Sequence, residues 1–81
     1  MKSLADETKL EIIRILLTGK KNVTSLSKVL RKSQPNTSIA LKNLLLVGLI
    51  TQERQGREVF YRVKNPDKVR QLIELLEDLE R

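Results

Sequence analysis

The chain has 81 residues, of which 40% are hydrophobic and 32% are charged, and its formal net charge is +6. It contains no Cys and no His, which excludes disulfides, Cys- or His-ligated metals and histidine general-base catalysis. A chain this short builds one small domain, which is marginally stable alone and often gains stability from a partner. No apolar run reaches membrane-spanning length and the N-terminus is charged too early for a secretory signal, so we expect a cytoplasmic protein with no membrane partner.

The positive charge is concentrated in the middle of the sequence. Residues 20–64 contain ten Lys or Arg and two Glu, whereas residues 1–19 are neutral and residues 65–81 are net negative. This distribution indicates a surface that faces a polyanion, and a solvated lysine-rich surface is the alternative. The many Lys, Glu, Ile and Leu residues also favour a heat-adapted source, a thermophile.

The first two predicted elements are helices. The first runs from about Asp6, its expected cap, to Thr18, and Gly19 follows its last apolar residue. Residues 21–23 should form a short extended connection. Thr24 is then the expected N-cap of a second helix of about seven residues, whose inner face carries Leu26, Val29 and Leu30.

A third helix and a hairpin follow. Ser33 is expected to cap the helix, Pro35 suits its first turn, and Gly48 ends it. From Leu49 the apolar period changes to two, which predicts a two-stranded hairpin with Gln55-Gly56 at the turn. Asn65-Pro66-Asp67 then ends the hairpin and begins a last helix.

The last helix carries apolar residues at heptad-like spacing. This stripe consists of Val69, Leu72, Leu76 and Leu79, with Ile73 and Leu75 alongside, and the candidate dimer contacts are Val69, Leu72, Ile73, Leu76 and Leu79. These residues exceed what one small core needs, so we expect the helix to pack on a two-fold-related copy of the chain. The alternative is that it only closes its own core.

Four segments together resemble the ArsR-type (arsenical-resistance-repressor-like) transcription regulators. "LADETKLEIIRIL" is similar to the family's opening helix and "LSKVLRKSQPNTSIALKNLLLVGLI" to its helix-turn-helix, with the S-Q-P-x-x-S core from Ser33 to Ser38. "ERQGREVFYRV" resembles the wing, and the heptad-like tail stands where the family has its dimerising helix. The resemblance implies a mainly α fold with a small β-hairpin, a winged helix-turn-helix. It implies one domain over residues 1–81, with 66–81 as the dimerisation helix.

The resemblance also implies a homodimeric repressor that binds double-stranded operator DNA. Polar groups at a positive helix end suit base edges and phosphates, and wing guanidinium groups suit phosphates or a narrow minor groove. Burial is the alternative for Thr37, solvation for Lys42, and a pure capping role for Ser33. The candidate DNA-binding residues are Gln34, Asn36, Thr37, Ser38, Lys42 and Asn43 in the third helix and Arg54, Gln55 and Arg57 in the wing.

The sequence departs from the family pattern in three ways. It lacks the Cys and His ligands of the metal-sensing branches, so we expect neither a metal sensor nor a cofactor, and the effector is undefined. Ile39 and Ala40 stand where the family commonly has Arg or Gln followed by His, which predicts weaker direct base readout and more backbone binding. Leu46 stands at a position that is often charged; it is either an isolated exposed leucine or meets the wing or the last helix.

Three rival functions were weighed. The sequence shows no nucleophile–base pair, phosphate loop or metal-ligand set, so an enzyme is not expected. A winged helix that binds a protein partner is one alternative, favoured by apolar residues on the outer face of the third helix. A weakly specific architectural DNA-binding protein is the other.

Overall fold

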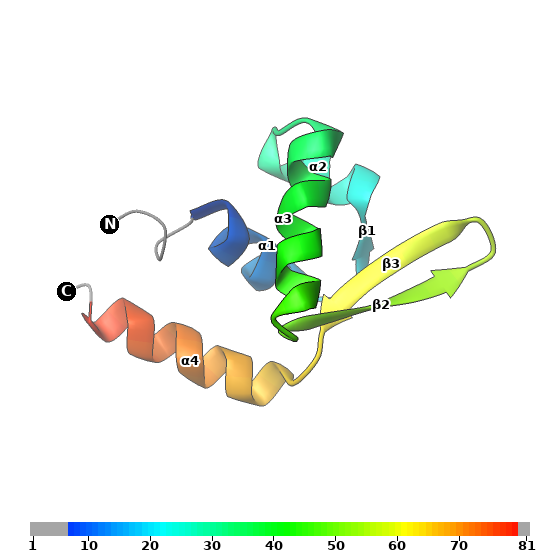
Figure 1. Cartoon of the computed structure of the whole chain (residues 1–81). Coiled ribbons are helices and arrows are strands. Elements are labelled where there is room, and N and C mark those ends of the chain that lie inside the picture. Colours follow the sequence, from blue (N-terminus) through cyan, green and yellow to red (C-terminus); the bar gives the residue numbers. More distant parts are fainter. Residues whose placement is uncertain (1–6, 80–81) are drawn as a thin grey trace.

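The computed structural model describes residues 7–79. Its helices are α1 (Glu7–Leu16), α2 (Val23–Leu30), α3 (Gln34–Leu46) and α4 (Pro66–Leu79), and its strands are β1 (Lys21–Asn22), β2 (Ile50–Gln55) and β3 (Glu58–Val63). Figure 1 shows α1, α2 and α3 gathered at the root of the long hairpin formed by β2 and β3, whereas α4 extends away from that hairpin. The element order and arrangement confirm the predicted winged helix-turn-helix.

The first helix is shorter than predicted. It ends at Leu16 instead of Thr18, because the N–H groups of Thr18 and Gly19 bond to the carbonyls of Ile15 and Leu16, three residues earlier (3.0 and 3.1 Å). Such tight bonds commonly close a helix end. The expected cap, Asp6, lies outside the described residues.

Residues 21 and 22 form a strand where a plain connection was expected. β1 pairs antiparallel with β3 and places Lys21 opposite Tyr61 and Asn22 opposite Phe60. The predicted two-stranded hairpin is present as β2 and β3, and β1 extends it to a three-stranded sheet with the order β1-β3-β2. A two-residue strand is too short to show any apolar period, so only its pairing with β3 reveals it.

The start and inner face of α2 also differ from the prediction. Asn22, and not Thr24, is the N-cap, since its side-chain oxygen accepts the N–H of Ser25 at 2.8 Å. Leu26 is buried as expected, but Val29 is 61% exposed. Ser27 is buried instead, because residues 26, 27 and 30 form the face of α2 that packs on the core.

The turn between α2 and α3 follows from two capping residues. Arg31 adopts a left-handed conformation (φ 59°, ψ 41°) and ends α2. Ser33 then caps α3 as predicted, its hydroxyl accepting the N–H of Asn36 at 3.2 Å, and Pro35 lies in the first turn. These caps set where α3 begins, and hence which side chains its N-terminus presents.

The core lies where α1, α2 and α3 meet the root of the sheet. Ala40, which stands where the family commonly has a polar residue, is 7% exposed and belongs to this core. The buried apolar residues are Ile12, Ile13, Leu16, Leu26, Ala40, Leu41, Leu44, Ile50, Val63, Val69 and Ile73.

The hairpin register places the turn one residue later than predicted. Gln55 pairs with Glu58, so Gly56 and Arg57 form the two-residue turn instead of Gln55-Gly56. Gly56 has φ +63°, and a positive φ at the first turn position is the arrangement of a type II′ hairpin turn. The shift puts Arg57 at the tip of the wing.

Candidate nucleic-acid interface

Most of the polar residues predicted for α3 are exposed. Gln34, Asn36, Ser38, Lys42 and Asn43 all reach the surface. The amide of Gln34 donates a long hydrogen bond (3.5 Å) to the hydroxyl of Thr24, which holds it beside the start of α2. The N-terminus of α3 therefore presents hydrogen-bonding side chains together with its positive dipole end.

Thr37 is the exception and is removed from the candidate contacts. It is fully buried, at 0% exposure. Its hydroxyl and its N–H both donate to the carbonyl of Ser33, at 3.0 Å each. The side chain therefore anchors the first turn of α3 against the core. The sequence already indicated this burial, because Thr37 is four residues before Leu41 and seven before Leu44, two core positions on the same face of α3.

The exposed residues of α3 divide into two sides. Asn36 and Asn43 lie seven residues apart, close to two helical turns, and so share one side of the helix. Both line a groove of about 260 Å³ next to α1, together with Thr8, Lys9, Lys32, Ile39 and Ala40. Ser38 and Lys42, four residues apart, do not line this groove. The predicted contacts of α3 are therefore two adjoining rows, and only one of them borders α1.

Two arginines of the wing are exposed and have no carboxylate partner within residues 7–79. Arg54 is exposed and lies opposite Val59 in the hairpin, and Arg57 is exposed in the turn. Within residues 7–79, no carboxylate pairs with Arg54, Arg57, Lys32 or Lys42. Their charge is available to an outside polyanion.

Other cations of the wing are paired with Glu53. Lys20 lies 3.3 Å and Arg62 3.8 Å from its carboxylate oxygens. The Lys20 hydrogen bond first, then the charges of Lys20 and Arg62, lower the pKa of Glu53. Gln55, a predicted DNA contact, is exposed but donates to the same carboxylate at 3.1 Å. Glu53 therefore neutralises Lys20 and Arg62, whereas Arg54 and Arg57 near the wing tip keep their charge.

Sequence reasoning missed the Glu53 cluster. Lys20 and Glu53 are far apart in the sequence, and the antiparallel pairings bring them together. Glu53 lies opposite Phe60, whose ring is 5.2 Å from the Lys20 ammonium. The apolar period of two predicted the strands of the wing, but not the lysine that contacts them.

The predicted dimerisation stripe of α4 is divided between the core and the surface. Val69 and Ile73 are buried in their own chain, at 5% and 8% exposure, so they are not available to a partner. Leu72, Leu76 and Leu79 are 45%, 37% and 80% exposed, and Leu75 is exposed beside them. An ion pair between Arg14 and Glu77 joins α1 to α4.

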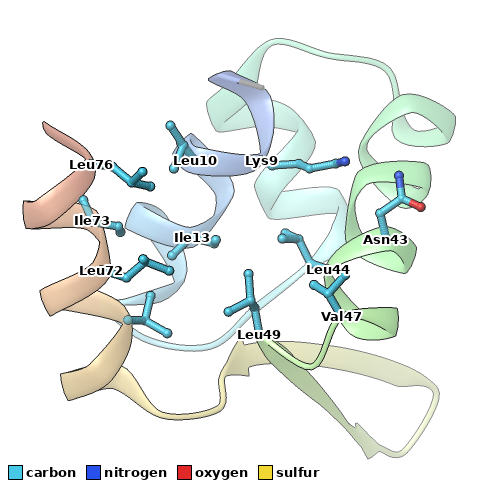
Figure 2. A pocket seen from close by; sticks show the side chains of 11 residues that line it. Lys9, Leu10, Ile13, Asn43, Leu44, Val47, Leu49, Leu72, Ile73 and Leu76 are labelled. Atoms are coloured by element: carbon cyan, nitrogen blue, oxygen red, sulfur yellow. The ribbon is translucent and has the colours of Figure 1, made fainter. Parts of the chain in front are cut away.

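An apolar cavity of about 250 Å³ lies between α1, α3 and α4. Figure 2 shows Leu10 and Ile13 of α1 pointing toward Leu72, Ile73 and Leu76 of α4. The remaining lining residues are Lys9, Asn43, Leu44, Val47, Leu49 and Val69. Because Leu72 and Leu76 border this cavity and also reach the surface, the chain leaves a connected apolar area uncovered.

Residues 7–79 contain neither a membrane-spanning helix nor a group of metal-ligating side chains. No helix there combines the length and apolar content needed to cross a bilayer. In the same range, no three acidic, His or Cys side chains are grouped as they would be around a metal ion.

Comparisons with known proteins agree with this geometry. HTH-type transcriptional regulator KmtR of Mycobacterium tuberculosis (strain ATCC 25618 / H37Rv) is 33% identical over 70 residues, which cover 86% of this chain. The chain spans about half the length of that relative, 53%. The crystal structure of the transcriptional regulator HlyU from Vibrio vulnificus CMCP6 matches 96% of this chain and 80% of its own, with 32% identity and a TM-score of 0.79.

A solution structure is also similar. The homodimeric winged helix-turn-helix DNA-binding domain of Mb0332 from Mycobacterium bovis matches 95% of this chain and 73% of its own, with 25% identity and a TM-score of 0.81. The profile of the family described as "Bacterial regulatory protein, arsR family" matches residues 6–52, more than half of the sequence. The chain therefore belongs to the arsR family of bacterial regulatory proteins.

Proposed function

We propose that the chain is a sequence-specific, double-stranded DNA-binding transcription repressor that acts as a homodimer and catalyses no reaction. One observation carries the proposal: Lys42 of α3 and Arg54 and Arg57 near the wing tip are exposed and have no carboxylate partner within residues 7–79, whereas Lys20 and Arg62 are paired with Glu53. A polyanion supplies the missing negative charge. Membership of a family of regulatory proteins supports the same conclusion.

The proposed DNA contacts follow from which side chains are exposed and on which side of α3 they lie. Gln34, Ser38 and Lys42 meet base edges and phosphates of the major groove from the exposed N-terminal half of α3. Arg54 and Arg57 hold the backbone or enter the minor groove. Asn36 and Asn43 reach DNA from the side of α3 that borders α1, and Gln55 only by giving up its bond to Glu53.

The proposed dimer uses the exposed part of α4. Leu72, Leu76 and Leu79 are the proposed contacts, and Val69 and Ile73 support them from the core. The open apolar cavity beside Leu72 and Leu76 supports a second copy as the occupant, since pairing would cover it. The homodimeric state of the similar Mb0332 domain supports this assignment.

The amino-acid composition limits which signal the protein can respond to. Because the sequence has no Cys and no His, the signal is not a metal held by those ligands, and no cofactor is proposed. The cytoplasmic location, the single domain over residues 1–81 and the heat-adapted source stay predictions.

Selection of bound duplexes from a random DNA pool tests the function. We expect one palindromic sequence, protected over a bounded length, with half-sites about 34 Å apart centre to centre. The variant Arg54→Gln/Arg57→Gln should bind this duplex much more weakly, and the control Lys20→Gln, which removes a paired cation, much less so. A long unbounded footprint would instead show an architectural DNA-binding protein.

A protein partner is the second candidate function. Ile39 and Leu46 on α3 are 61% and 79% exposed, which suits an apolar contact. Retention on heparin or nonspecific duplex DNA at low salt separates the two functions. A protein of net charge +6 that is not retained would favour the protein partner.

A further inference from the structure

Ile39, in the second turn of α3, is an apolar side chain that is 61% exposed. We propose that Ile39 recognises the 5-methyl group of thymine in the major groove, so that each half-site of the bound duplex requires thymine at one position facing this residue. The inference rests on the proposed DNA-binding function and names part of the sequence that this function reads.

The position of Ile39 along the helix is the first argument. In helix-turn-helix proteins the N-terminal part of the recognition helix approaches the base edges. Ile39 is five residues beyond the start of α3, or roughly 8 Å along its axis. Leu46, a further seven residues on, is roughly 10 Å beyond Ile39 and close to the end of the helix. Ile39 therefore lies in the part of α3 that enters the groove, and Leu46 does not.

The surroundings of Ile39 are the second argument. The neighbours three or four residues away on the helix surface are all exposed: Asn36, Lys42 and Asn43 are polar, and Pro35 is not. Ile39 also lines the groove beside α1 together with Asn36 and Asn43. The inward positions of α3 are already occupied by Thr37, Ala40, Leu41 and Leu44. Ile39 is thus an apolar side chain beside hydrogen-bonding and cationic side chains, and it does not pack in the core.

The chemistry of the groove is the third argument. The thymine methyl is the apolar feature of the major-groove edge, whereas guanine, adenine and cytosine present polar atoms there. A β-branched side chain holds its methyl groups in few rotamers and offers them at little entropic cost. Placing Ile39 against a polar base edge would remove water from that edge and supply no hydrogen bond. Discrimination then comes from both the gained methyl contact and this desolvation cost.

Uracil substitution tests the contact directly, since uracil lacks only the methyl group. The probe is the tightest duplex recovered from the random pool, remade with each thymine replaced in turn by uracil. At the thymine facing Ile39, one replacement should weaken wild-type binding about fourfold, which corresponds to burial of one methyl-sized group, and replacement in both half-sites about 15-fold. Ile39→Ala should remove this sensitivity at that position alone.

Leu46→Ala provides a matched control. It removes a similar exposed side chain from the same helix face and should keep the full response to uracil. Recovery of a tight duplex that tolerates uracil at every thymine would overturn the inference and leave the proposed function standing. So would a uracil response that persists in Ile39→Ala. Failure to recover any duplex would overturn the proposed function itself, and the inference with it.

Discussion

The sharpest prediction concerns Arg57 at the tip of the wing. Lys32, Lys42, Arg54 and Arg57 have no carboxylate partner within residues 7–79. If each neutralises one phosphate, a dimer neutralises about eight, and the slope of log affinity against log salt is about −7. Affinity should then fall roughly 10⁴-fold between 50 and 200 mM salt.

Arg57→Gln removes two of these contacts per dimer. The slope should become less steep by about 1.8, to about −5, because each phosphate contact that is lost lowers the number of counterions released on binding by about 0.9. Fluorescence anisotropy of the selected duplex, measured over a series of KCl concentrations, gives this slope. A shallow wild-type slope joined to sharp sequence discrimination would contradict the predicted large share of backbone binding.

Lys20→Gln is the matched control for Arg57→Gln. It removes the same charge from the same wing, but Lys20 is held by Glu53, 3.3 Å away. Its slope should stay within about 0.5 of the wild type, since a paired cation neutralises little phosphate charge. Equal changes in the two variants would refute the reasoning, because binding would then follow net charge and not the placement of unpaired cations.

Three further predictions test the site. Thr37→Val should cost about 0.5 to 1.5 kcal/mol in denaturant unfolding and leave DNA affinity unchanged, since the Ser33 carbonyl keeps the backbone N–H of residue 37; a loss of affinity alone would contradict its burial. Leu72→Glu should yield monomers in sedimentation, whereas the control Gln71→Glu should leave the dimer; an intact Leu72→Glu dimer would place the interface elsewhere. NMR titration should find the pKa of Glu53 below 4.5 and closer to that value in Lys20→Met, and no difference between the two proteins would count against the Lys20 contact. Because the folded pKa is the lower one, the stabilisation by Glu53 is present above about pH 4.5 and is lost as pH falls through the folded value.

The sequence by itself determined the element order and most of the helix and strand types. Local signals decide these features: Ser33 caps α3, glycines follow α1 and α3, and the apolar period changes after Gly48. Such signals act within one or two turns of chain, so they can be read without knowing what packs where. The polar N-terminus of α3 and the arginines of the wing were identified in the same way.

The tertiary structure alone decided which of these residues are available. Burial removed Thr37 from the candidate DNA contacts, and Val69 and Ile73 from the predicted dimer contacts. The β1–β3–β2 pairings brought Lys20 to Glu53, whereas Arg54 and Arg57 near the wing tip have no carboxylate partner within residues 7–79. Burial and cross-strand pairing depend on segments far apart in the chain, whereas a periodic pattern records only which side of an element is apolar.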